Sequence, residues 1–369
     1  MIDEIKLTKN LIKINSTNPG KYEKEVFKFL EKLFKKEGVK YKKYLLDKDR
    51  PNLVIKIGNK DIKDNILFIG HLDTVPFGQL SWKHDPLGAR EINGKIYGRG
   101  STDMKSGIAA MCSAVIKYKN SNFKNKNIIL AIVSGEETGC EGSKLLAKKL
   151  KSEKISAIIS GEPTNNYPLL GHKGVLWLEA IVSGKTSHGS TPQYGINSIY
   201  NAMDYIKILK KYKFKQTNRY MKKSTINIGT FFSGQNINSV PDKAVFSIDI
   251  RTVDSNQYYM KEIQKIFKNK NVKIREMVNL DMVYNEKWKS QKYLNLLKNI
   301  CKYSKKRFNP SFANYFTDIS PFQKNHRNPL NIIVGPGTTS MAHQTNEYVK
   351  KSEITKSKKI YEYLINELC

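Results

Sequence analysis

Long apolar runs are missing from this chain of 369 residues. A helix needs about 18 or more consecutive apolar residues to cross a bilayer, and no stretch reaches that length. Charges at Asp3, Glu4 and Lys6 also interrupt the apolar segment that a secretory signal peptide would need. We therefore expect no membrane span, no membrane partner and a cytoplasmic location.

Cysteine is scarce, with only four residues and no C-x-x-C pair. The four are scattered along the chain, at Cys112, Cys140, Cys301 and Cys369. This spacing favours free thiols in a reducing compartment over a disulfide framework.

Acidic residues and arginine are also few compared with lysine. The chain has 64 Lys and Arg against 33 Asp and Glu, a formal net charge of +31, and arginine occupies only eight positions. Nucleic-acid sites favour arginine forks and clustered aromatic side chains, whereas these lysines are spread over the whole chain. We therefore expect a solvated lysine-rich surface and no nucleic-acid partner. The alternative is that this surface attracts acidic partners.

The first 174 residues alternate between helical and strand patterns, and their strands are aliphatic runs. Helices are expected over residues 2–14, 22–38, 105–118 and 142–151, and strands over residues 52–57, 65–70, 127–133 and 155–160. Such alternation predicts an α/β fold with a covered, mostly parallel sheet.

The pattern changes after Gly174 and returns near residue 285. Strands that alternate polar and apolar residues are expected over residues 175–182, 224–231 and 244–251, with helices over residues 196–212 and 255–268. Strands with two helices in about 110 residues predict a small α+β sandwich. We expect residues 177–284 to form this domain, inserted into a discontinuous domain of residues 1–176 and 285–369.

Ligand-type side chains follow several of the aliphatic strands. His71 comes directly after the apolar run Ile66–Ile69, and Asp73 lies two residues further on. The other candidates that follow strands are Glu136, Glu137, Glu162 and His343. Parallel strands present their carboxyl ends at one edge of a sheet, where ligands bind. A further candidate, Asp103, precedes the helix expected from residue 105, whose N-terminus favours an anion.

Each of these residues alone has an ordinary explanation. A single histidine at a strand end is commonly a hydrogen-bonded core residue, and a Glu-Glu pair is commonly a solvated loop. Acids beside a buried strand nevertheless need partners, because an unpaired buried charge is costly. Ligand-type residues at five places on one sheet edge therefore indicate a shared metal site.

Charge balance favours two divalent ions in this site. Two Zn²⁺ ions carry four positive charges; Asp103, Glu137 and Glu162 carry three negative charges, and a hydroxide ion would add the fourth. His71 and His343 are neutral as ligands, so the cluster could be buried without net charge. Histidines with carboxylates suit Zn²⁺, and Co²⁺ or Mn²⁺ could replace it. Glu136 is then left free as a general base.

Four motifs resemble a known family in their order and spacing. They are Gly-His-Leu-Asp-Thr-Val-Pro at residues 70–76, Gly-Arg-Gly-Ser-Thr-Asp-Met-Lys at 98–105, Gly-Glu-Glu-Thr-Gly at 135–139 and Gly-Glu-Pro-Thr at 161–164. The family is that of the dinuclear zinc amidohydrolases, which includes acetylornithine deacetylase, succinyl-diaminopimelate desuccinylase, aminoacylases and glutamate carboxypeptidases. The resemblance implies a zinc-exopeptidase-like catalytic domain that is interrupted by a lid and dimerisation domain.

The resemblance also implies how the ligands divide between two Zn²⁺ ions in each subunit. Asp103 would bridge both ions, and the peptide bond after it would be cis. His71 and Glu162 would complete one site, and Glu137 and His343 would complete the other.

Two residues would act on this centre and on the substrate. By resemblance, Asp73 would orient His71. Glu136 would take a proton from the attacking water and then give it to the leaving amine.

Residues of the inserted domain would complete the site in a homodimer. By resemblance, His188 would reach the active site of the partner subunit and stabilise the oxyanion of the tetrahedral intermediate. Asn238 would face the substrate, and Arg251 would bind its α-carboxylate. The alternatives are a turn histidine at position 188 and a pairing of Arg251 with Asp249.

The substrate implied by the resemblance is a small N-acyl-L-amino acid. The segment Asn-Tyr-Phe-Thr-Asp at residues 314–318 is more similar to acetylornithine deacetylase than to desuccinylases, which typically carry Gly-Thr-Ser-Asp there. N²-acetylornithine is therefore the first candidate, and Thr317 is the expected contact. Succinyl-diaminopimelate desuccinylase, another N-acyl amino acid hydrolase or a dipeptidase are the alternatives. A non-catalytic relative would be expected to lose ligands or the base, and all are present.

Three histidines remain without a role in the metal centre. His172 lies at the start of the inserted domain, at a position suited to a hinge or a substrate contact. His84 and His326 are expected on the surface.

Overall fold

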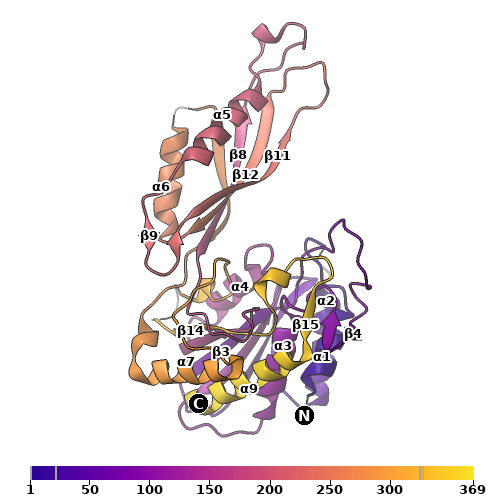
Figure 1. The fold of residues 1–369 in the computed structure, drawn as a ribbon, viewed down its shortest axis with the longest axis vertical. Helices are drawn as coiled ribbons and strands as arrows, with labels where there is room; N and C mark the ends of the chain where they lie inside the picture. The colour runs from indigo at the N-terminus through magenta and orange to yellow at the C-terminus, as the bar shows by residue number, and fades with distance from the viewer. Residues whose placement is uncertain (1, 21–22, 269, 324–325, 327) are drawn as a thin grey trace. The chain divides into compact units, whose positions relative to one another are not determined.

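The computed structural model describes residues 2–20, 23–268, 270–323, 326 and 328–369. The chain forms two compact units, which Figure 1 shows as a ribbon. Unit 1 comprises residues 1–171, 284–311 and 317–369. Unit 2 comprises residues 172–283 together with the later segment 312–316.

Unit 1 is built on a six-stranded sheet with the order β1-β2-β6-β3-β7-β14. Its strands are β1 (Lys42–Asp47), β2 (Arg50–Ile57), β3 (Asp64–His71), β6 (Asn127–Val133), β7 (Lys154–Ser160) and β14 (Leu330–Ile333). Strands β6, β3, β7 and β14 are parallel to one another, whereas β2 is antiparallel to β6 and β1 is antiparallel to β2. The predicted α/β fold with a mostly parallel sheet is confirmed.

Shorter elements and helices complete unit 1. A three-stranded sheet has the order β15-β5-β4. Its strands are β4 (Arg90–Ile92), β5 (Lys95–Tyr97) and β15 (Tyr348–Lys350). The helices are α1 (Glu4–Ile12), α2 (Glu23–Lys36), α3 (Lys105–Lys117), α4 (Glu141–Lys149), α7 (Gln291–Ser304), α8 (Ser320–Gln323) and α9 (Lys351–Leu368), with 3₁₀ turns η2 (Lys287–Lys289) and η3 (Thr339–Met341). None of the described helices is long and apolar enough to cross a membrane.

The core of unit 1 lies where α3 covers β3 and β6. The β3 run Ile66–Ile69 is fully buried, as an aliphatic strand covered on both faces should be. Helices α1, α3 and α9 pack against one another (Figure 1). The rings of Phe68 on β3 and Tyr361 on α9 meet edge to face, with centroids 5.8 Å apart. This packing fixes the sheet edge at which the candidate site lies.

Unit 2 is an antiparallel sheet with the strand order β11-β12-β8-β13, and helices α5 and α6 pack on it. Its elements are β8 (Gly174–Ser183), η1 (Pro192–Tyr194), α5 (Ser198–Lys211), β9 (Thr217–Asn218), β10 (Lys222–Lys223), β11 (Thr225–Ser233), β12 (Lys243–Thr252), α6 (Asn256–Phe267) and β13 (Val272–Leu280). Along β12, Ala244, Phe246, Ile248 and Ile250 are buried at alternate positions. That period of two places one face of the sheet under the helices, with the architecture of an α+β sandwich.

Candidate metal centre and active site

Three neighbouring parallel strands carry candidate ligands to one edge of the unit 1 sheet. His71 ends β3 and lies beside Val133, the last residue of β6. Glu136 and Glu137 follow β6, and Glu162 follows β7, the other neighbour of β3. The strand order therefore brings together side chains that are as much as 91 residues apart in the sequence, from 71 to 162.

The turn between β6 and the two glutamates depends on a glycine. Gly135 has a φ of 72°, in the region that side chains disfavour. A Cβ atom at this position would also collide with the guanidinium of Arg50. The Ser-Gly-Glu-Glu order is thus a steric requirement of the turn that presents Glu136 and Glu137.

Asp103 lies between the two histidines. Its Oδ1 is 3.2 Å from His71 Nε2, and its Oδ2 is 3.5 Å from His343 Nε2. His71 Nε2 is also 3.7 Å from Glu162 Oε1, and His343 Nε2 is 3.0 Å from Glu137 Oε1. Two groups of ligands therefore meet at one carboxylate. The peptide bond between Asp103 and Met104 is cis, as expected from the resemblance.

The described residues could hold cations in three overlapping groups, in each of which the ligand atoms lie within 4.8 Å of one another. The groups are His71, Asp103 and Glu162; Asp103, Glu137 and His343; and His71, Glu136 and Glu137. The first two groups have the composition that the resemblance implies. The third contains Glu136, so the geometry leaves open a role for Glu136 as a ligand as well as a base.

The donor atoms fit a divalent metal. Asp103 Oδ1 and Glu162 Oε1 are buried and accept no hydrogen bond from any described residue. Buried carboxylate oxygens need compensation, which a cation supplies. Carboxylate oxygens and imidazole nitrogens are also the donors found in dinuclear hydrolase centres. These residues therefore fit the metal-binding role.

Burial and mutual repulsion raise the pKa of three of the four acids of the site, and a bound cation would oppose this shift. Burial, followed by repulsion from neighbouring acids, raises the pKa of Glu136, Glu137 and Glu162. Burial also acts to raise the pKa of Asp103, but the two histidines outweigh it and the pKa is lowered. The cluster thus concentrates negative charge in a low dielectric, where a divalent ion is strongly favoured.

Both histidines respond to these acids. Burial opposes protonation of His71, but Asp103 and the other acids raise its pKa well above the usual value. A hydrogen bond to Glu137 is the main reason that the pKa of His343 is raised to about 9. His71 Nδ1 lies 2.9 Å from the carbonyl oxygen of Asp73, to which it donates when the proton is on Nδ1. That tautomer leaves the lone pair of Nε2 facing Asp103 and Glu162.

Asp73 connects the histidine to the two glutamates. Its carboxylate accepts hydrogen bonds from the backbone N–H groups of Glu136 and Glu137, at 3.2 and 3.1 Å. The nearer carboxylate oxygen is 3.6 Å from His71 Nδ1, and Asn18 donates to the other at 3.0 Å. Asp73 therefore orients the Glu-Glu turn directly, and it holds His71 mainly through its backbone carbonyl.

No role was predicted for Glu347 from the sequence, yet it organises the loop that carries Asp103. Its buried carboxylate accepts hydrogen bonds from the backbone N–H groups of Gly100, Thr102 and Asp103, at 3.0, 2.7 and 3.1 Å. It also pairs with Arg99 Nη1 at 2.8 Å. Burial raises the pKa of Glu347 to about 7, while Arg99 favours the ionised form.

Arg99 links this loop to the one that carries His343. Its guanidinium donates to the carbonyl oxygens of His343 and Gln344, at 3.4 and 3.2 Å. Arg99 and Glu347 together therefore hold two ligands from distant segments, Asp103 and His343, in register. We call this pair the Arg99–Glu347 clamp.

Glu136 is buried and lies beside another buried acid that the sequence analysis passed over. Its carboxylate has one close partner in the described chain, Cys140 Sγ at 3.9 Å. Asp318 is fully buried, and neither of its carboxylate oxygens has a hydrogen-bond partner among the described residues. Burial raises the pKa of Asp318 to about 6, and its charge in turn helps to raise the pKa of Glu136.

Unit 2 carries three of the predicted residues. His188 is exposed, its Nδ1 lies 2.7 Å from Ser190 Oγ, and its segment pairs with the segment of Asn238 through a Gly189–Asn238 hydrogen bond of 2.7 Å. Arg251 pairs with Asp249 on the same strand, at 2.9 Å from Nε to Oδ1. The alternative considered for Arg251 is thus present in the structure, and its substrate role stays a prediction.

Thr317 and the remaining histidines are placed as follows. Thr317 is fully buried in unit 1, and its Oγ1 accepts a hydrogen bond from Ile319 N at 3.2 Å. His172 is fully buried, which lowers its pKa to about 4. His84 is half-buried. The expected surface position of His326 is wrong, because its ring stacks on Phe322 and its side chain is buried.

The fold and the candidate metal ligands at its sheet edge are of the kind found in metal-dependent hydrolases. Residues 67–367 match the model of the peptidase family M20/M25/M40, so the chain belongs to that family. It is a metal-dependent hydrolase that acts on amide bonds, and the family resemblance seen in the motifs is confirmed.

Similar proteins agree with this assignment. A probable succinyl-diaminopimelate desuccinylase of Staphylococcus epidermidis is 29% identical over an alignment of 391 positions, which covers 95% of this chain and 93% of the relative. An acetylornithine deacetylase of Buchnera aphidicola is 30% identical over 337 residues, covering 87% of this chain and 84% of the relative. An M20 family metallo-carboxypeptidase from Sulfolobus solfataricus has the same fold, with a TM-score of 0.82 at 21% identity, covering 100% of this chain and 99% of that structure.

Proposed function

We propose that this enzyme removes the acyl group from an N-acyl-L-amino acid, with N²-acetylornithine as the first candidate. The main supporting observation is that the buried Glu136 lies beside two histidine–carboxylate groups that share Asp103. The acetyl group and ornithine are supported by the Asn-Tyr-Phe-Thr-Asp segment and by the 30% identical acetylornithine deacetylase. The products would be ornithine and acetate.

We propose that two Zn²⁺ ions bind in each subunit, with Co²⁺ or Mn²⁺ as substitutes. His71 and Glu162 would hold one ion, Glu137 and His343 the other, and Asp103 both. When bound, such ions polarise a substrate carbonyl and lower the pKa of water. The buried, unpartnered oxygens of Asp103 and Glu162 support this arrangement.

In this proposal the protein moves one proton through Glu136. The carboxylate takes a proton from the attacking water, and the acid then gives that proton to the nitrogen of the leaving amine. Burial raises its pKa above the usual range of a carboxyl group, which favours the proton-holding form that donates to the leaving amine. Asp73 supports the step by holding the backbone of Glu136 and Glu137 in place.

Desuccinylation of N-succinyl-diaminopimelate is the second candidate. The desuccinylase relative is 29% identical and aligns with 95% of this chain, more than the deacetylase relative does. Both substrates place an amide next to an α-carboxylate, so the proposed chemistry is the same for both. They differ in the acyl group and in the amino acid side chain.

A side-by-side substrate test separates these candidates. We expect the Zn²⁺- or Co²⁺-loaded protein to release amine from N²-acetylornithine at least about tenfold faster than from N-succinyl-diaminopimelate, a difference of about 1.4 kcal/mol in the barrier. A chelated sample is the control and should be inactive. The reverse preference would replace the first candidate by the second. If neither compound is cleaved by protein that holds two metals per chain, both substrates are rejected.

We propose that unit 2 is a lid and forms a homodimer through β11 and α5. β11 is an edge strand, and Phe231 and Phe232 on it are 39% and 68% exposed. On α5, Tyr200 and Met203 are 67% and 47% exposed. Exposed apolar side chains beside an unpaired strand edge are typical of interaction surfaces. In the dimer, His188 would stabilise the oxyanion in the partner's site, while Asn238 and Arg251 would contact the substrate.

Replacing Phe232 with aspartate should convert the dimer to a monomer, because a charge would be buried in the interface. Light scattering should then report half the wild-type mass, and turnover should fall because His188 no longer reaches a partner. Met277→Asp is the matched control, since Met277 is 53% exposed on β13, the opposite edge of the sheet. A monomeric wild-type protein with full activity would rule out this dimer.

A cytoplasmic location is proposed from the thiols. All four cysteines are free, and burial raises the pKa of Cys112 to about 12. Buried, protonated thiols fit a reducing compartment. Cell fractionation would test this, and recovery outside the cytoplasm would contradict it.

A further inference from the structure

A hollow of about 450 Å³ lies in unit 1, lined at its base by the first half of β6. Ile129 of this hollow belongs to that half, whereas Glu136 and Glu137 follow the end of the strand. We call the hollow the lysine groove. Its lining residues are Lys40, Tyr41, Lys42, Tyr44, Val54, Lys56, Ile129, Lys149, Leu150, Ser152 and Glu153. The groove is therefore separate from the candidate metal centre.

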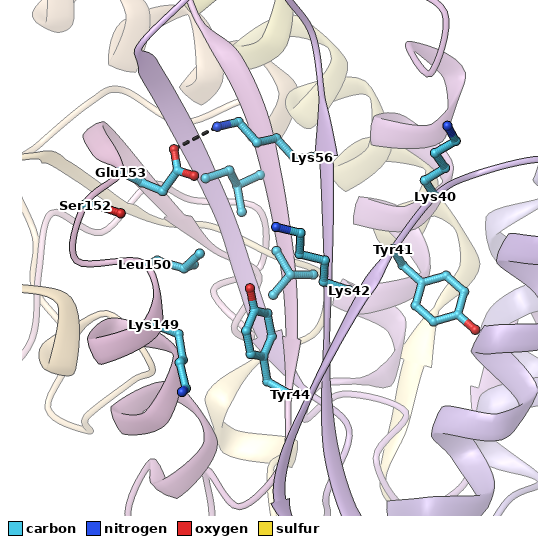
Figure 2. Close-up of a pocket in the computed structure, with 11 residues that line it drawn as sticks. Lys40, Tyr41, Lys42, Tyr44, Lys56, Lys149, Leu150, Ser152 and Glu153 are labelled. Carbon is cyan, nitrogen blue, oxygen red and sulfur yellow. Dashed lines mark hydrogen bonds and ion pairs between the residues drawn. The ribbon is translucent and has the colours of Figure 1, made fainter. Parts of the chain in front are cut away.

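The strand register explains why lysines gather at this place. Lys42 on β1 is opposite Val54 on β2, and Lys56 on β2 is opposite Ile129 on β6. Alternate residues of a strand point to the same face, so these side chains share one face of the sheet with Tyr44. Figure 2 shows Lys42, Tyr44 and Lys56 reaching toward the segment that holds Leu150 and Glu153.

The groove has an excess of positive charge. Four lysines line it against one glutamate, which leaves a formal charge of +3. Glu153 is already occupied: its Oε2 pairs with Lys56 at 2.7 Å, as Figure 2 shows. The same oxygen also accepts a hydrogen bond from Asn65 Nδ2 at 3.2 Å. Within the described part of the chain, Lys42 and Lys149 have no carboxylate partner. A concave surface lined by one sign of charge concentrates its field and attracts the opposite charge.

The floor of the groove is apolar. Val54, Ile129 and Leu150 are buried, with exposed fractions of 5%, 1% and 6%. The Tyr44 side chain lies beside them, and no described residue bonds to its hydroxyl. An apolar floor below a cationic rim suits a ligand with a flat apolar part and an anionic part. The volume is also in the range of small-molecule sites, about 300 to 1,000 Å³.

We propose that the lysine groove binds a phosphorylated small molecule with a planar apolar portion, of the nucleoside phosphate class. The phosphates would contact Lys42 and Lys149, and the planar portion would lie against the half-buried ring of Tyr44 above the apolar floor. A polyanion that binds any basic surface does so through charge alone, whereas a ligand of this groove would also be held by the apolar floor. In this proposal the lysines that line the groove have a binding function, unlike the lysines spread over the rest of the chain.

Calorimetric titration of the metal-loaded protein with ADP, in about 150 mM salt to screen long-range attraction, tests the proposal. We expect one saturable site per chain. Adenosine and pyrophosphate, which each carry half of the proposed features, should each bind at least about tenfold more weakly than ADP. Equal affinity for ADP and pyrophosphate would overturn the role of the apolar floor.

Matched double variants locate the site. The double variant Lys42→Gln, Lys149→Gln should weaken ADP binding at least about tenfold. The control is the double variant Lys210→Gln, Lys211→Gln, which removes the same charge from α5. It should change the affinity for ADP less than about twofold. All four side chains are exposed, so folding should be retained and can be checked by thermal unfolding. Equal loss in both variants would show general attraction to a basic protein. Unchanged ADP affinity in the Lys42/Lys149 variant would show that ADP binds elsewhere, such as at the metal centre. Either of these two results would overturn the proposal.

Discussion

Replacing Glu136 with glutamine is expected to lower kcat by about 100- to 10,000-fold, the usual range for loss of a general base. Glutamine keeps the size of the side chain but cannot take the proton from water. Metal content should stay unchanged, because neither of the two groups that share Asp103 includes Glu136. Turnover and metal analysis of the same preparation would check both expectations.

The neighbouring variant Glu137→Gln is the matched control. Glu137 pairs with His343, so this substitution should lose metal as well as activity. If Glu136→Gln loses metal instead, the third ligand group, which contains His71, Glu136 and Glu137, is the occupied one. Near-normal turnover in Glu136→Gln would remove Glu136 from the proton transfer.

Replacing Glu347 with glutamine is expected to weaken metal affinity by about 10- to 100-fold, as loss of a partner that orients metal ligands typically does. The carboxylate accepts three backbone N–H groups around Asp103 and pairs with Arg99. An amide removes the charge that pairs with Arg99 and turns one acceptor into a donor. Competition with a chromophoric chelator measures the affinity independently of turnover.

Glu353→Gln provides the comparison for this experiment. Glu353 also accepts a hydrogen bond from a backbone N–H in this part of unit 1, that of Gly337 at 3.0 Å. Among the described residues it accepts none from the loop of Asp103. Its loss should leave metal affinity within about twofold of wild type, as expected for a residue outside the shell that orients the ligands. Wild-type affinity in Glu347→Gln, with thermal unfolding unchanged, would show that the clamp does not position the ligands.

Local sequence signals identified the elements that carry the site. The aliphatic runs of β3, β6 and β7 are buried strands, as predicted, because three or more consecutive apolar residues in a strand are kept from water only when both faces of the sheet are covered. The ligand-type residues directly follow these runs. Their convergence could be predicted because parallel strands must end at the same edge of the sheet.

Helices and strands with a weak or mixed apolar periodicity in their sequence were not predicted. β1 and β13 are edge strands whose many charged side chains hide the alternation, and most of their residues remain exposed or half-buried. Helix α9 has only a narrow apolar face, which becomes buried when it packs on α1 and α3. Their assignment depends on neighbours that are distant in the sequence.

The sequence by itself determined the α/β class, the inserted α+β region, the family and the candidate ligands, since each rests on local apolar periodicity or a short motif. Only the tertiary structure decided which polar groups support those ligands. Arg99 and Glu347 are 248 residues apart, yet they form one buried ion pair. Their partnership depends on satisfying buried polar groups after folding, and no local pattern records it. The burial of His326 and the pairing of Arg251 with Asp249 were decided in the same way.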